Sequence, residues 1–106
     1  MSARTEKMAY KIVITWQAKE DTQTAYDYYE GQRKDLGEEF LEELVKKYDD
    51  LSEHPQHYGY IDNRGIIRDV KINRFPYVIV FEIIEQRVIV YAIHNTYRHP
   101  KRKLKR

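Results

Sequence analysis

Three consecutive β-strand patterns between residues 66 and 94 constrain the fold more than any other feature of this chain. Residues 66–73 alternate apolar and polar side chains, residues 77–84 are almost entirely apolar, and residues 88–94 form a second apolar run. Each connection between them has three residues, whereas a parallel pair needs a crossover of about a dozen or more. The sequence therefore predicts an antiparallel three-stranded meander, with Pro76 at its first turn.

A strand and two helices are predicted before the meander. Residues 10–16 are β-branched and aromatic, which is typical of a strand, and the face they share would hold Tyr10, Ile12, Ile14 and Trp16. Apolar positions then follow the helical period, first up to about Gly31 and again after Leu36-Gly37. The two stripes are Ala18, Thr22, Ala25 and Tyr29, and Phe40, Leu41, Leu44, Val45, Tyr48 and Leu51. Tyr26, Tyr28, Tyr29 and Tyr48 are interpreted as packing around this hairpin. The order β-α-α-β-β-β predicts an α+β fold, a curved antiparallel sheet with the helix hairpin packed on one face.

Length and composition limit the function classes. The 106 residues suffice for one domain, which we expect at residues 9–100 between a disordered extension at 1–8 and a basic tail at 101–106. No apolar run approaches the roughly 20 residues that span a bilayer, and no secretory signal is evident. Cysteine is absent, and the four histidines lack the i, i+4 pairing of common zinc motifs. We therefore expect a cytoplasmic protein without a metal or other cofactor, and place His54 and His57 in the loop of residues 52–65.

Charge is segregated along the chain although the net charge is only +2. Residues 17–53 hold five basic and twelve acidic residues, whereas residues 54–106 hold eleven basic and four acidic ones. The predicted helices are thus acidic and the predicted sheet with its tail is basic. Such a distribution directs a polyanion to one side of the molecule, although a solubilising tail beside amphipathic helices would give the same pattern.

Basic and aromatic side chains gather at the predicted open face of the sheet. Because Val70 and Ile72 would face the core, Lys71 would point to the opposite side, and the last strand would end beside the same surface. The candidate contacts to a target or a nucleic acid are Arg68, Arg74, Tyr97, Lys101 and Arg102. Lysine and arginine bind phosphate, and tyrosine offers a stacking surface to a base.

Metal-free RNA cleavage would require a base, a cation that stabilises the transition state, and an acid. Lys71 would serve as the stabilising cation, or as the base if it lost its proton. Arg98 suits the transition-state role because it is always charged, and His94, His99 or Tyr97 would be the acid. The same residues also fit plain structural roles, with Lys71 an outward strand lysine and His94 a hydrogen-bonded strand end.

Over residues 9–100 the chain resembles the RelE/ParE superfamily of bacterial toxins. The resemblance rests on the element order, on Arg74-Phe75-Pro76-Tyr77 before an apolar strand, and on Ala92-Ile93-His94 followed by Arg98. Further matching positions are Ala18, Leu51, Pro55 and Ile67-Arg68. The stretch from Arg74 to Tyr77 is most similar to the ParE-like, plasmid stabilisation branch.

The resemblance implies the toxin of a two-gene toxin–antitoxin module. RelE-like toxins cleave mRNA on the ribosome, and ParE-like toxins poison DNA gyrase. Lys71 and Arg98 match basic positions of the RelE-like nucleases, but Asn73 and Val78 stand where those enzymes often carry basic residues. No tyrosine follows Arg98, so the RelE-type ending is not reproduced.

Three hypotheses follow from the resemblance. The preferred one is a ParE-like growth inhibitor acting on DNA gyrase or a similar target through protein contacts. The alternative is a ribosome-dependent endoribonuclease that uses Lys71 and Arg98 with His94 or His99. The third is a non-toxic domain that only binds the antitoxin. In each case the family implies a cognate antitoxin as the partner, in a toxin–antitoxin hetero-oligomer, with no role for a membrane.

Overall fold

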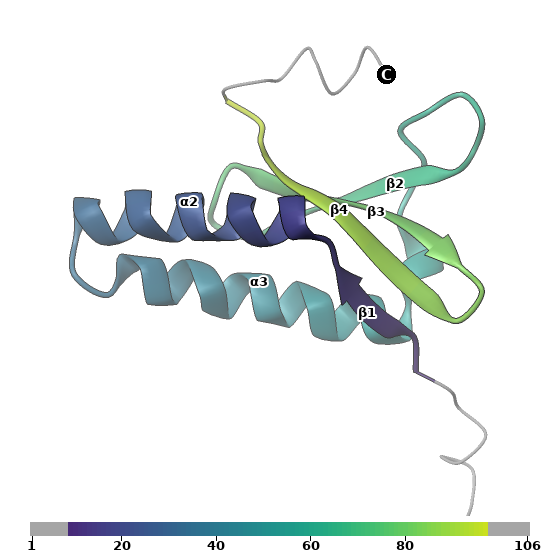
Figure 1. Cartoon of the computed structure of the whole chain (residues 1–106), viewed down its shortest axis with the longest axis horizontal. Coiled ribbons are helices and arrows are strands. Elements are labelled where there is room, and N and C mark those ends of the chain that lie inside the picture. Colours follow the sequence, from purple (N-terminus) through teal and green to yellow (C-terminus); the bar gives the residue numbers. More distant parts are fainter. Residues whose placement is uncertain (1–8, 98–106) are drawn as a thin grey trace, which may run out of the picture.

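The computed structural model describes residues 9–97, and their element order is the predicted β-α-α-β-β-β. The elements are β1 (Lys11–Ile14), α2 (Trp16–Gln32), α3 (Leu36–Glu53), a short 3-10 helix (Pro55–His57), β2 (Ile67–Lys71), β3 (Tyr77–Ile84) and β4 (Arg87–Asn95). The predicted α+β class is confirmed, with two long helices lying against an open, curved sheet (Figure 1). The expected extension at 1–8 and the tail at 101–106 lie outside the described residues.

The sheet has the order β1-β4-β3-β2. The pairs β2–β3 and β3–β4 are antiparallel, which confirms the meander, but β1 lies parallel to β4. The sheet is therefore mixed rather than antiparallel throughout. The short-connection argument did not apply to β1, because the helices and two strands between β1 and β4 supply a connection long enough for parallel pairing.

A bulge shapes β4 where β1 ends. Register shifts between Val80 and Phe81 of β3, so that Tyr91 is an extra residue on β4. β1 pairs with β4 only as far as Val90, and the chain then turns into α2. The rest of β4 consequently runs alongside α2 instead of alongside a strand.

Thr15 starts α2 and fixes it to the sheet. Its backbone is extended, and its hydroxyl accepts a hydrogen bond from the Ala18 amide at 3.3 Å, as an N-cap residue does. The same hydroxyl donates to the carbonyl of Val90 at 2.8 Å. The predicted strand therefore ran too far, since Trp16 opens α2 and is 73% exposed.

The second helix is capped from the first. Asp35 precedes α3 in the left-handed region, with φ of 71°, and its side chain makes no cap hydrogen bond. Instead the Glu30 carboxylate accepts hydrogen bonds from the amides of Asp35 at 2.9 Å and Gly37 at 3.0 Å. These bonds satisfy amides that a helix N-terminus leaves unpaired. The sequence at Leu36-Gly37, expected to separate the helices, is the start of α3.

The core lies between the helix hairpin and one face of the sheet. Its buried members come from both helices, from β2, β3 and β4, and from the turn between β2 and β3. They are Ala18, Ala25, Phe40, Leu44, Leu51, Val70, Ile72, Phe75, Tyr77, Ile79, Phe81, Val88, Val90 and Ile93. Ile12 and Ile14 of β1 are partly buried against this cluster. Fully burying one such large side chain stabilises the fold by about 1.5–3 kcal/mol. Because these side chains all lie on the sheet face that the helices cover, the opposite face remains open.

Candidate functional site

The predicted site residues lie in three different settings. Lys71 and His94 are on strands of the sheet, whereas Arg68 and Arg74 are held in contacts with other parts of the domain. Tyr97 is 83% exposed just after β4. The remaining predicted residues, Arg98, His99, Lys101 and Arg102, lie outside the described residues.

Lys71 and His94 lie in one row across the open face of the sheet. Lys71 pairs with Val78 on one side of β3, and Val78 pairs with His94 on the other. Because neighbouring strands are about 4.8 Å apart, the two backbone positions are separated by about 10 Å. Val78 is only 6% exposed, although it does not belong to the core between helices and sheet. The lysine and the imidazole thus flank an apolar floor.

The basic charge of the second half of the chain is concentrated beyond the described sheet. Residues 54–97 carry five basic and four acidic residues, whereas residues 98–106 carry six basic residues and no acidic one. On the described open face, Lys71 has Asp69 two residues before it on the same strand. Within residues 9–97 the sheet is therefore close to neutral.

Arg74 is tied to the helix hairpin. It lies in the β2–β3 turn with φ of 76°, and its Nη2 donates a hydrogen bond to Glu39 of α3 at 2.8 Å. Its Nη1 lies 3.9 Å from the carboxylate of Glu43, a residue that is 8% exposed. The hydrogen bond from Arg74, followed by that from Arg33, lowers the pKa of Glu39. Arg74 therefore closes an ion-pair cluster on the helix side of the molecule.

The Arg-Phe-Pro-Tyr stretch places its two rings in the core. Phe75 contacts Tyr29 and Phe40, with ring centroids 4.8 and 5.3 Å apart. Tyr77 lies 5.3 Å from Phe40. Edge-to-face aromatic contacts at these distances contribute beyond the area that they bury. The stretch accordingly joins the β2–β3 turn to both helices.

Arg68 holds the long loop against β2. Its Nη1 donates to the carbonyl of Tyr58 at 2.7 Å, and its Nη2 donates to the hydroxyl of Tyr60 at 2.6 Å. The guanidinium carbon also lies 4.0 Å from the centre of the Tyr60 ring. In the same loop, the rings of His54 and His57 are stacked 4.8 Å apart. Arg68 therefore stabilises the connection between α3 and β2.

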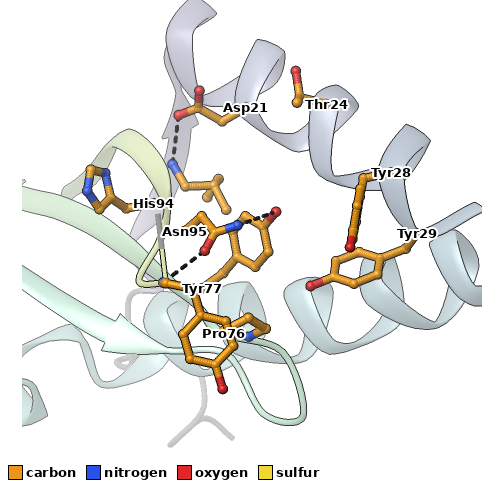
Figure 2. A pocket seen from close by; sticks show the side chains of 10 residues that line it. Asp21, Thr24, Tyr28, Tyr29, Pro76, Tyr77, His94 and Asn95 are labelled. Atoms are coloured by element: carbon orange, nitrogen blue, oxygen red, sulfur yellow. Dashed lines mark hydrogen bonds between the residues drawn. The ribbon is translucent and has the colours of Figure 1, made fainter. Parts of the chain in front are cut away.

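A pocket of about 550 Å³ opens between α2 and the end of β4 (Figure 2). It is lined by Asp21, Thr24, Tyr28, Tyr29, Pro76, Tyr77, Ile93, His94, Asn95 and Tyr97. The His94 ring points away from the tyrosines in Figure 2. Burial, followed by the neighbouring Tyr77, raises the pKa of Tyr29 to about 12. The phenol of Tyr29 therefore stays neutral at physiological pH.

Asp21 and Tyr28 were not predicted as site residues. Asp21 Oδ2 accepts a hydrogen bond from the Ile93 amide at 3.0 Å, so that α2 satisfies a donor on β4 beyond the end of β1. Tyr28 was interpreted as hairpin packing, yet it is 54% exposed. The available signal was the polar stripe Gln17, Asp21, Thr24 and Tyr28, whose spacing of four, three and four puts it on one side of a helix.

Two further observations concern residues 9–97 alone. In this range no group of three or more histidine, cysteine, aspartate or glutamate side chains is arranged to hold a metal ion. Neither helix in the same range has the length and hydrophobicity needed to cross a membrane.

Comparison with known proteins identifies the family. The family model described as "ParE toxin of type II toxin-antitoxin system, parDE" matches residues 12–100. The chain belongs to the ParE toxin family. Among solved structures, one described as "Chromosomal ParDE TA system from P. aeruginosa" is similar to the chain, with a TM-score of 0.72 and 16% sequence identity. The match covers 82% of this chain and 96% of that one. A search of curated proteins finds no match.

The predicted membership of the RelE/ParE superfamily is thereby confirmed. Membership in the ParE toxin family also makes this chain a toxin-type component of a toxin–antitoxin system, for which an antitoxin is the implied partner. Of the matched residues 12–100, the structure describes 12–97, from β1 through the end of β4.

Proposed function

We propose that this ParE-family toxin arrests bacterial growth by binding DNA gyrase or a similar protein target, and that its cognate antitoxin neutralises it. The observation that carries the proposal is the match of the ParE toxin model to residues 12–100. Inhibition of this kind requires a complementary surface and no proton transfer. The proposed setting is the bacterial cytoplasm, with toxin and antitoxin in a hetero-oligomer and without a cofactor.

The charge of the described sheet supports binding of a protein rather than of RNA. Proteins that bind nucleic acid do so mainly through clustered basic residues. Residues 54–97 are nearly neutral in sum, and two of their five basic residues, Arg68 and Arg74, are engaged with the loop and with α3. In the gyrase proposal, the contacts to the target would come from Tyr97 and from residues 98–106, including Lys101 and Arg102.

A ribosome-dependent endoribonuclease remains the second candidate, because Lys71 and His94 share one row on the open face. In that candidate Lys71 would stabilise the pentavalent phosphate, and His94 or His99 would protonate the leaving oxygen. Arg98 would add a permanent positive charge. A non-toxic domain that only binds the antitoxin is the third candidate.

Expression of the chain alone in a bacterial host separates these candidates. Incorporation of labelled thymidine and of labelled amino acids is followed together over the first minutes after induction. We expect DNA synthesis to fall first, and the purified chain to inhibit supercoiling by gyrase. An earlier fall in protein synthesis, with cuts in ribosome-bound mRNA, would instead establish the nuclease. Unimpaired growth despite antitoxin binding would establish the non-toxic domain.

A paired variant sharpens this experiment. Lys71→Gln combined with His94→Gln removes the ammonium group and the imidazole ring from the row. The matched control, Lys19→Gln combined with His57→Gln, removes one lysine and one histidine from exposed positions elsewhere. We expect both double variants to arrest growth as the wild type does. Loss of arrest in the first alone, with antitoxin binding retained, would favour the nuclease.

A further inference from the structure

The pocket between α2 and β4 combines exposed aromatic rings with one fixed negative charge. Tyr28 and Tyr97 at its rim are 54% and 83% exposed, and Tyr28 lies edge-on to Tyr29 with ring centroids 5.1 Å apart. Of the ten lining residues, Asp21 is the one acidic residue. A carboxylate pairs with a cation, and the exposed aromatic rings elsewhere in the pocket offer contact area to the segment that carries the cation.

The carboxylate of Asp21 is held in place from two sides. Its Oδ2 accepts from the Ile93 amide at 3.0 Å, and its Oδ1 accepts from the Gln17 side chain at 2.8 Å. A carboxylate has about four lone-pair positions, so each oxygen can accept a further donor. Because the helix and the strand already fix its orientation, Asp21 would lose little conformational entropy on pairing with a ligand.

The helix beside the pocket is also negative. Helix α2 carries Glu20, Asp21, Asp27 and Glu30 but only one basic residue, Lys19. The pocket has a volume of about 550 Å³, which is more than one side chain fills. Next to it, β4 extends five residues beyond its pairing with β1, from Tyr91 to Asn95.

We propose that this pocket receives the ammonium or guanidinium group of a lysine or arginine of the antitoxin. The inference rests on the proposed function, since it takes the antitoxin as the partner. The cation pairs with Asp21, and the neighbouring residues of the antitoxin segment lie along the part of the pocket lined by Tyr28, Pro76 and Tyr97. A basic anchor at this point complements the acidic helix and would help to select the cognate antitoxin.

The test is a comparison of two isosteric substitutions on α2. Asp21→Asn removes the negative charge but keeps an oxygen that can accept from the Ile93 amide. Asp27→Asn is the matched control, because Asp27 is exposed, lies outside the pocket lining, and accepts from Gln23 at 2.9 Å as Asp21 does from Gln17. Affinity for the antitoxin encoded beside the toxin gene is measured by calorimetry, and circular dichroism verifies the fold of each variant.

We expect Asp21→Asn to weaken antitoxin binding by about tenfold to a hundredfold, because Asp21 is only partly buried and loses one charge-assisted partner. The control should change affinity by less than about twofold. Tyr28→Leu should also weaken binding, and Tyr28→Phe should restore most of it, because the ring and not the hydroxyl contacts the antitoxin segment. Replacing each lysine and arginine of the antitoxin by glutamine should identify one position whose effect is not additive with Asp21→Asn.

Three results would overturn the inference, and they point to different errors. If Asp21→Asn binds the antitoxin as tightly as the wild type does, the pocket is not a cation site, although the proposed function stands. If Asp21→Asn binds more tightly, the cation in the pocket belongs to the basic residues 98–106 of the toxin itself, which compete with the antitoxin. If the wild-type chain does not bind the antitoxin, the proposed function fails together with the inference.

Discussion

Arg74 in the β2–β3 turn and Glu39 on α3 are joined by a 2.8 Å hydrogen-bonded ion pair. Arg33, at the end of α2, reaches the same carboxylate with two contacts of 3.3 Å. One glutamate thus links the first helix, the second helix and the turn between two strands. The arginine that begins the Arg-Phe-Pro-Tyr stretch has a structural partner, and Phe75 beside it fills the core.

The ion pairs of Glu39 with Arg74 and Arg33 should make the protein less stable at acidic pH than at neutral pH. The two arginines lower the pKa of Glu39 below its ordinary value of 4.5, with the bond from Arg74 as the largest cause. A carboxylate whose pKa is lower in the folded state stabilises the protein above its unfolded pKa, and this stabilisation is lost as the pH falls through the folded pKa. Glu39→Gln should therefore lower the urea midpoint at about pH 7, and lower it less at an acidic pH well below 4.5.

The control for this measurement is Glu20→Gln, which changes an exposed acid on α2. It should leave the urea midpoint unchanged at both pH values. An equal loss of stability for Glu39→Gln at neutral and acidic pH would show that the ion pairs with Arg74 and Arg33 contribute nothing to it.

The elements with a strong period were predictable, because burial decides them locally. The stripe from Phe40 to Leu51 and the apolar run from Tyr77 to Ile84 both form the expected helix and strand. The parallel partnership of β1 with β4 was not predictable from connection lengths, since it joins segments some 75 residues apart. Thr15 shows the same limit, because its capping role depends on its hydroxyl also reaching Val90 of a distant strand.

The site was predicted less completely than the fold. Alternation placed Lys71 on the open face, and the structure adds that His94 shares its row through Val78. The partners of Arg68 and Arg74 lie on other elements, so no local pattern indicated that these two arginines are engaged. The role of Asp21 depends on the amide of Ile93. This amide lies beyond the last pair of β1 with β4, so it donates to Asp21 instead of to β1.

Two glycines at opposite ends of the helix–helix connection should respond to alanine in opposite ways. A methyl group at Gly37 would lie 2.7 Å from a ring carbon of Tyr26 and 2.9 Å from the Tyr26 carbonyl oxygen, so backbone atoms would have to move. Gly31 has no such neighbour within 4 Å and lies inside α2. Gly37→Ala should cost about 1–3 kcal/mol of unfolding free energy, and Gly31→Ala should add about 0.5–1 kcal/mol.

Urea denaturation of the two variants measures both effects. The slope of the unfolding free energy against urea concentration should be the same in both variants as in the wild type. A stable Gly37→Ala variant would mean that α2 and α3 separate at little cost at this point. In that event the close approach of Gly37 to Tyr26 would have no part in holding the hairpin together.

The hydroxyl of Tyr48 should be dispensable, unlike that of Tyr58. Within residues 9–97 the buried Tyr48 hydroxyl has no hydrogen-bond partner, whereas the Tyr58 hydroxyl donates to the carboxylate of Asp50. A buried polar group without a partner destabilises the folded state, and a satisfied one stabilises it by about 1 kcal/mol. Tyr48→Phe should therefore leave the unfolding free energy unchanged or raise it by about 1 kcal/mol, and Tyr58→Phe should lower it by a similar amount.

Alkaline pH provides an independent measurement of the same two tyrosines. Burial raises the pKa of Tyr48 from 10.0 to about 12, and burial followed by the bond to Asp50 raises that of Tyr58 to about 12. A group whose pKa is higher in the folded state contributes its full stabilisation below the unfolded pKa. That contribution is lost as the pH rises through the folded pKa, here between 10 and about 12. The wild type should lose stability over this interval, and Tyr48→Phe should lose less. Equal losses in the two proteins, followed by urea denaturation and by phenolate absorbance, would mean that Tyr48 is accessible to water in the folded state.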